Sequence, residues 1–197
     1  MTMTNQEKSS HLNRTINGSI SFVRSDDEKE EGKYLLSFSS QKPYERWFGT
    51  EILDHSEKAV NLKRLNSIGC LLFNHHRDDV IGKINRAWIE NGKGYAEVTF
   101  DDDEFSQKIK KKVDNKTLTG VSVGYSVDSW EEVTIGRKSA DGFSGPCHIA
   151  RSWFPYEISI VSVPADETVG VGRTLSTNNK LASLELAEKQ IQINKNL

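Results

Sequence analysis

The chain has 197 residues and a mass of 22.2 kDa, which is enough for one folded domain with additional tails. Its net charge of -2 excludes a broad basic surface for nucleic acid, and no apolar run approaches the roughly 18 residues of a membrane span. Residues 1–15 are too polar for a signal peptide, and two cysteines without CxxC spacing indicate neither a disulfide framework nor a zinc site. We therefore expect a cytoplasmic protein that needs no metal or organic cofactor and binds neither nucleic acid nor membrane.

The N-terminal part is predicted to contain short strands joined by polar loops. Residues 1–15 are predicted to be a disordered tail, and the alternating residues 16–23 a first strand. The acidic residues 25–32 follow as an exposed loop, and residues 34–39 form a second strand. The folded part of the chain is therefore expected to begin near residue 16.

A compact apolar run at residues 70–73 ends abruptly in the polar residues 74–79. Such a run between polar segments predicts a buried strand. His75 and His76 then lie at the exit of this strand, and His75 shares one strand face with Leu71 and Phe73 by alternation.

A hairpin and a helix are predicted next. Asn91-Gly92 is typical of a tight turn and joins the strands predicted at residues 80–90 and 95–100. The acidic residues 101–104 open a helix whose apolar residues recur every four positions, at Phe105, Ile109 and Val113.

The strand predicted at residues 120–127 carries the first candidate for chemistry. Its valines and Tyr125 point to one face, and its glycines and serines point to the other. Gly120 and Gly124 remove the side chains on either side of Ser122, so another backbone can approach its hydroxyl closely. Ser122 is therefore the candidate nucleophile, with residues 132–137 as a possible hairpin partner of its strand.

A last strand is predicted at residues 156–163 and is stopped by Pro164. Glu157 and Ser159 share one face of it, and a carboxylate in so apolar a strand requires a partner. His75 is a suitable partner, so that His75, Ser122 and Glu157 could serve as base, nucleophile and orienting group.

Less specific interpretations of the same residues remain open. A serine between glycines is commonly a bulge or a packing position, and Glu157 could pair with Arg151 or Lys83 at a sheet edge. The His and Asp residues at 75–79 lack an HExxH pattern and a distant third metal ligand. Cys147-His148 does not form a nucleophile and base pair, because adjacent strand residues face opposite ways.

Many short strands with one or two helices predict a β-rich α+β fold. The expected architecture is a single-domain, closed or nearly closed β-barrel with a few peripheral helices. The predicted domain covers residues 16–173, and residues 174–197 form a polar C-terminal tail with a short amphipathic helix.

Five segments of the chain, in the same order and at similar spacing, resemble the prohead maturation serine proteases of tailed bacteriophages. They are Arg46 to His55, Leu72 to His75, Val80 to Gly82, Gly120 to Tyr125, and Glu157 to Ala165. The resemblance implies that residues 16–173 are the protease domain, with a fold like that of the herpesvirus assembly protease. It places the catalytic triad of the family on His75, Ser122 and Glu157.

The resemblance also implies a biological task. Such a protease cleaves N-terminal segments of the scaffold or major capsid protein, and commonly itself, inside the immature prohead in the host cytoplasm. The gene could equally belong to a prophage in a bacterial genome, and a homo-oligomer is expected by analogy. His76 stands where the family often has an acidic or other polar residue, which leaves His76 as an alternative base if the motif is shifted by one.

Two further points remain open in the sequence. The oxyanion hole could use backbone N–H groups near Gly124 or in residues 142–145, or the side chain of Arg151. A competing hypothesis is a catalytically inactive scaffolding or assembly protein, which binds capsid subunits through the charged helix at residues 104–113 and the tail helix.

Overall fold

The structure is a computed structural model that describes residues 12–16, 21–22 and 32–163. All of these belong to one compact unit, Met1–Glu167, and a second unit, Thr168–Leu197, lies outside the described residues. The tail predicted at residues 174–197, with its amphipathic helix, and most of the N-terminal tail therefore also lie outside them.

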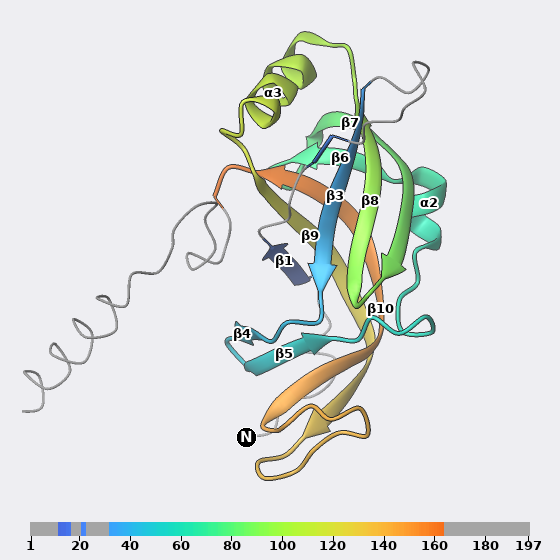
Figure 1. The fold of residues 1–197 in the computed structure, drawn as a ribbon, viewed down its shortest axis with the longest axis vertical. Helices are drawn as coiled ribbons and strands as arrows, with labels where there is room; N and C mark the ends of the chain where they lie inside the picture. Colours follow the sequence, from blue (N-terminus) through green and yellow to red (C-terminus); the bar gives the residue numbers. More distant parts are fainter. Residues whose placement is uncertain (1–11, 17–20, 23–31, 164–197) are drawn as a thin grey trace, which may run out of the picture. The chain divides into compact units, whose positions relative to one another are not determined.

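The described residues form ten strands and two helices (Figure 1). The strands are β1 (Leu12–Ile16), β2 (Ser21–Phe22), β3 (Lys33–Ser40), β4 (Tyr44–Arg46), β5 (Gly49–Leu53), β6 (Cys70–Phe73), β7 (His76–Glu90), β8 (Lys93–Phe100), β9 (Gly120–Val133) and β10 (Cys147–Val161). The helices are α2 (Lys63–Ile68) and α3 (Glu104–Asp114). Neither of these helices is long and apolar enough to cross a membrane.

All ten strands belong to one sheet, and this confirms the prediction of a β-rich fold. The strand order is β1-β9-β10-β6-β7-β8-β3-β2, and β5 pairs with both β10 and β4. Within the described residues no pairing joins the two ends of this order, so the sheet is not closed into a barrel. Of the predicted closed or nearly closed barrel, full closure is therefore wrong for these residues.

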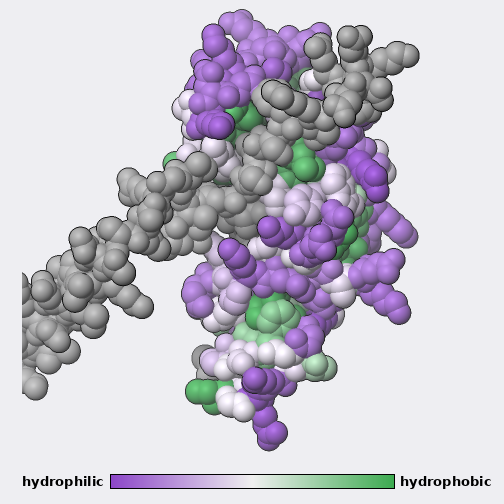
Figure 2. Space-filling view, in the orientation of Figure 1, coloured by the Kyte–Doolittle hydropathy of each residue, from purple (hydrophilic) through white to green (hydrophobic). Residues whose placement is uncertain are grey.

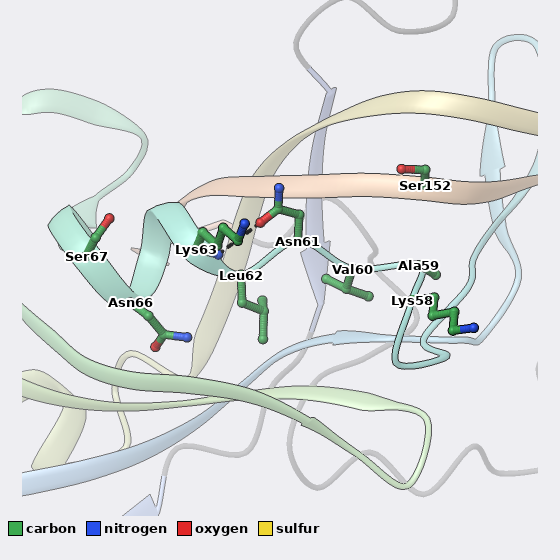
Figure 3. Close-up of a pocket in the computed structure, with 9 residues that line it drawn as sticks. All are labelled: Lys58, Ala59, Val60, Asn61, Leu62, Lys63, Asn66, Ser67 and Ser152. Carbon is green, nitrogen blue, oxygen red and sulfur yellow. Dashed lines mark hydrogen bonds between the residues drawn. The ribbon is translucent and has the colours of Figure 1, made fainter.

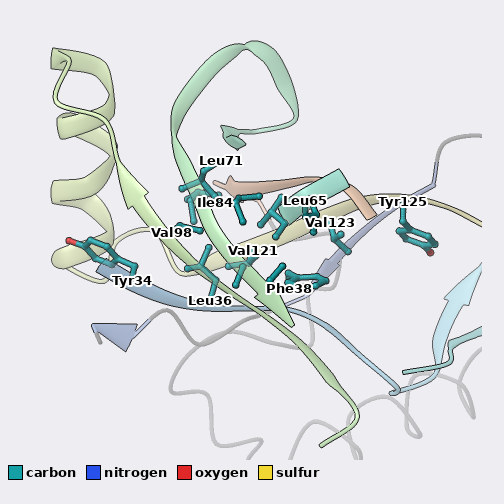
Figure 4. Packing of buried hydrophobic residues seen from close by; sticks show 14 of the residues in the cluster. Tyr34, Leu36, Phe38, Leu65, Leu71, Ile84, Val98, Val121, Val123 and Tyr125 are labelled. Atoms are coloured by element: carbon teal, nitrogen blue, oxygen red, sulfur yellow. The ribbon is translucent and has the colours of Figure 1, made fainter. Parts of the chain in front are cut away.

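Side-chain packing takes the place of the missing closure. β3 comes near β9, and the two strands contribute Leu36, Phe38, Val121 and Val123 to one buried cluster (Figure 4). Apolar side chains therefore fill the space between β3 and β9 without backbone hydrogen bonds between them.

Elements specified by local sequence signals form as predicted. Asn91 and Gly92 have φ values of 50° and 69°, which is the left-handed pair that a two-residue hairpin between β7 and β8 requires. Asp103 caps α3 by accepting a hydrogen bond from the backbone N–H of Ser106 at 3.0 Å. The strand predicted at residues 70–73 is β6.

The surface modifies one expectation about α3. Ile109 and Val113 are buried, whereas Phe105 is 39% exposed and the apolar stripe is therefore only partly covered. Figure 2 shows a largely hydrophilic face with separate hydrophobic patches. The other large apolar side chains that are exposed in the described residues are Trp47, Ile68, Val80, Ile135 and Val163.

The paired strands β9 and β10 differ from the prediction. β9 continues to Val133, and its hairpin partner is β10 rather than residues 132–137. The strand continues because Val133 packs with Ile52, Cys147 and Ile149 in a small second core. Pro155 is tolerated inside β10 because the pairing shifts register next to it.

A buried polar cluster ties the β4–β5 hairpin to β9. The Tyr125 hydroxyl donates to Glu51 at 2.5 Å and accepts from the Arg46 guanidinium at 2.7 Å. Arg46 also donates to Glu51 through Nε at 2.7 Å, and Glu51 is fully buried. Although burial acts to lower it, the pKa of Arg46 is raised by the neighbouring Tyr125 and Glu51. The cluster thus holds β9 at Tyr125, which is three residues beyond Ser122.

Replacing Arg46 should test this cluster. We expect Arg46→Met to lower the free energy of unfolding by about 3–5 kcal/mol, because it leaves a buried carboxylate without its cation. Urea unfolding measures the change, and Arg46→Met combined with Glu51→Met should recover most of it. A loss below about 1 kcal/mol in the single variant, the range of exposed pairs, would contradict the role assigned to the cluster.

Candidate active site

Ser122 lies near the beginning of β9, between β1 and β10. Val121, Val123 and Tyr125 point into the core as predicted, so the Ser122 side chain projects from the opposite face of the strand. Ser122 is directly opposite Ser159 of β10 in the antiparallel register. Directly opposite residues share a face, so the two serines lie side by side.

Glu157 lies on the same face of β10, opposite Gly124. A Cβ atom added to Gly124 would lie 2.6 Å from Glu157 Cγ and 2.7 Å from Glu157 Oε1. Only glycine therefore leaves room for the carboxylate to fold back over β9. The bare face that the sequence predicted around Ser122 accommodates Glu157.

His75 reaches this face from a turn rather than from a strand. Asn74 and His75, with φ values of 50° and 63°, are the central residues of the tight turn that joins β6 to β7. β6 ends at Phe73, so the expectation that His75 shares a strand face with Leu71 and Phe73 is wrong. Histidine and asparagine adopt the left-handed region more readily than most residues, which suits them to these positions.

Two hydrogen bonds attach His75 to β10. Its Nδ1 pairs with Glu157 Oε1, and its backbone N–H donates to Ser159 Oγ at 3.2 Å. A carboxylate only accepts, so the Nδ1 proton points at Glu157 and the neutral imidazole keeps its lone pair on Nε2. The structure thus brings His75 and Glu157 together. Ser159 contacts His75 and lies opposite Ser122, so it connects this pair with the position of Ser122.

Asn74 fixes the turn itself. Its backbone N–H donates to the carbonyl of Ile160 at 2.9 Å, and its Oδ1 accepts from the backbone N–H and the hydroxyl of Ser162 at 2.9 and 3.2 Å. These contacts hold the turn against the C-terminal end of β10. Asn74 and Ser159 hold His75 in position, and the sequence signals for them are only indirect, namely adjacency to His75 and a face shared with Glu157.

The two neighbouring histidines differ in environment. The His75 side chain is 24% exposed beside Glu157, whereas that of His76 is 72% exposed and lies 3.4 Å from Asp79. Burial and the neighbouring Glu157 carboxylate raise the pKa of Tyr156, as expected beside an anion in a site shielded from water. Because His75 contacts Glu157 whereas His76 contacts Asp79, His75 is favoured over His76 as the base.

Arg151 lies away from this cluster and is bound by carboxylates. Its guanidinium contacts Asp54 at 2.9 Å, Glu131 at 2.6 Å and Asp141 at 2.8 Å. The hydrogen bonds from Arg151 hold the pKa of the Asp141 carboxyl well below its usual range. The guanidinium is thus committed to structural ion pairs, and Arg151 does not pair with Glu157.

Other candidates do not form a second site. Cys147 is buried in the small core while His148 packs against Phe48, so these adjacent residues face opposite ways as predicted. A cavity of about 770 Å³ next to α2 is lined by residues 58–63, Asn66, Ser67 and Ser152 and by none of the candidate catalytic residues (Figure 3). In the described ranges no group of three or more His, Cys, Asp or Glu residues could hold a metal ion.

Comparison with known proteins shows which sequences this chain resembles. The model of a family described as caudovirus prohead serine protease matches residues 22–182. A protein named "Major capsid protein" from Halomonas phage phiHAP-1 is 32% identical over 163 residues, which are 81% of this chain and 26% of that protein. The chain therefore spans about a quarter of the length of this curated relative. No solved structure matches the chain.

Gly124 offers a test of the packing around Glu157. We expect Gly124→Ala to displace the Glu157 side chain and to lower the free energy of unfolding by about 1–3 kcal/mol, as overpacking does. Loss of the low-field ¹H NMR signal of the His75 Nδ1 proton would report the broken contact.

Gly120→Ala is the matched control, because its added Cβ would meet Val161 rather than Glu157. The control should keep the Nδ1 signal even if it loses stability. Retention of the signal in Gly124→Ala would show that Glu157 does not need this glycine.

Proposed function

The chain belongs to the caudovirus prohead serine protease family, and we propose that it is a serine endopeptidase with Ser122, His75 and Glu157 as its catalytic residues. The observation that carries the proposal is the hydrogen bond between His75 Nδ1 and Glu157 on the face from which Ser122 projects. A histidine oriented by a carboxylate beside a serine is the arrangement that activates a hydroxyl for acyl transfer.

The proposed mechanism follows from the proton positions. His75 Nε2 takes the proton from Ser122 Oγ while Oγ bonds to the scissile carbonyl carbon. Glu157 holds the imidazole by its Nδ1 proton and stabilises the imidazolium. The imidazolium then protonates the leaving amine, and water hydrolyses the acyl-enzyme by the same route.

The proposed substrates are N-terminal segments of the scaffold or major capsid protein, and the chain itself by autocatalytic cleavage. The relative named as a major capsid protein, a quarter of which corresponds to this chain, supports a capsid protein as partner. We further propose that cleavage occurs inside the immature prohead in the host cytoplasm, that the enzyme is a homo-oligomer, and that its fold is related to the herpesvirus assembly protease.

A second candidate function is that of an inactive scaffolding or assembly protein. The complete burial of Ser122 favours this alternative, because a nucleophile must come within about 3–3.5 Å of the carbonyl carbon. The two candidates differ in covalent chemistry, since only a protease reacts with reagents that acylate or phosphonylate activated serines.

Ser122→Ala should separate the two candidates. We expect it to reduce cleavage of a co-expressed capsid protein by roughly 10⁴-fold or more, because the acyl acceptor is lost. Intact-mass analysis detects the shortened capsid subunit, and a fluorophosphonate should label Ser122 in the unaltered protein.

Ser126→Ala is the control, since Ser126 projects from the same face of β9 four residues further on. It should cleave normally. Shells assembled from full-length subunits around the unaltered protein, with Ser122 unlabelled, would favour the scaffolding candidate.

A pair of histidine variants tests the identity of the base. His75→Ala should lower the rate of cleavage by roughly 10⁴-fold or more, because Ser122 loses its proton acceptor. His76→Ala should retain near-normal turnover, since its side chain is exposed and contacts Asp79 rather than Glu157. Peptide-cleavage kinetics on both variants decide between them, and the reverse outcome would move the base to His76.

A further inference from the structure

The edge of β9 that faces away from β10 is occupied by a short segment of the same chain. β1 runs antiparallel to β9, with Leu12 opposite Tyr125, Thr15 opposite Ser122 and Ile16 opposite Val121. Five residues of extended backbone are therefore paired along the segment that carries the proposed nucleophile. The position is that of an extended peptide added to a sheet edge.

The two neighbours of β9 are held very differently. β10 pairs with β5 and β6 as well as β9, and it contributes Trp153, Ile158 and Ile160 to the main core. β1 stands at one end of the strand order and, among the described residues, pairs with β9 alone. Short end strands open more easily than strands paired on both sides, so β1 is the neighbour that can leave without unfolding the core.

Access to Ser122 requires that part of its surroundings move. Ser122 is 0% exposed in this conformation, so no peptide carbonyl can reach its hydroxyl. Removing β1 would free the backbone N–H and C=O groups on the outer edge of β9 at residues 121–125. These groups can pair with an extended polypeptide that runs antiparallel to β9, as β1 does, and they place little demand on its side chains.

We propose that this edge of β9 is the substrate-binding edge, and that residues 12–16 occupy it in place of substrate. This inference rests on the proposed function. The partner is an extended segment of the capsid or scaffold polypeptide, which adds antiparallel to β9 after β1 leaves. β1 therefore competes with substrate within the same chain.

The test replaces Asn13 and Arg14 together by proline in the full chain. Adjacent N–H groups point to opposite sides of a strand, so the pair removes at least one donor directed at β9. Labelling of Ser122 is then followed with a small fluorophosphonate and with a peptidyl phosphonate long enough to pair along β9. Asn5→Pro with Gln6→Pro is the control outside β1.

We expect the Asn13→Pro, Arg14→Pro protein to react with the peptidyl reagent about tenfold faster. This factor corresponds to a rise in the binding-competent state, in which β1 has left β9, from about a tenth of the molecules to nearly all of them. The control pair should leave the rate unchanged. An unchanged rate in a folded Asn13→Pro, Arg14→Pro protein would overturn the inference. Failure of both reagents to label Ser122 in any protein would instead overturn the proposed function.

Hydrogen exchange on the unaltered chain gives a second measurement that does not depend on the folding of a variant. Amides of residues 12–16 should exchange faster in the peptidyl adduct than in the fluorophosphonate adduct, because the peptide takes their place on β9. Equal protection of these amides in the two adducts would mean that β1 stays in the sheet while peptide is bound, and would refute the proposal.

Discussion

The antiparallel pairing of β9 with β10 is the constraint on which the rest of the site depends. Its register sets Ser122 opposite Ser159 and Gly124 opposite Glu157, all on one face. The valines of β9 point to the other face and fill the core with residues of β3. A slip of one residue would turn the hydroxyls into the core and the valines outward, so hydrophobic burial itself maintains the arrangement of polar groups.

The turn that carries His75 shows how the fold holds an unfavourable conformation. Left-handed φ values at two successive non-glycine residues cost free energy and persist only where surrounding contacts fix them. Here β10 and the residue that follows it supply the contacts: Glu157 for the imidazole, Ser159 for the backbone of His75, and Ile160 and Ser162 for Asn74. The C-terminal end of β10 and Ser162 thus orient the His75 imidazole and position the turn.

The same packing that aligns these groups also closes the site. Ser122 is flanked by paired strands on both sides and has no exposed surface, although the His75 side chain is partly exposed. The proposed protease would have to remain inactive until substrate polypeptide is concentrated around it. A high local concentration of polypeptide favours intermolecular strand addition over the proposed intramolecular pairing of β1 with the substrate-binding edge.

Local signals in the sequence determined much of the fold and the types of residue in the site. Period-two alternation identified the faces of residues 120–127, turn chemistry identified Asn91-Gly92, and the cost of burying Glu157 implied a partner. Tertiary structure alone decided the length of the β9–β10 pairing, the open sheet and the left-handed turn of His75. Glu157, the partner of His75, lies 82 residues further along the chain. Such contacts depend on packing between distant segments, which no local pattern encodes.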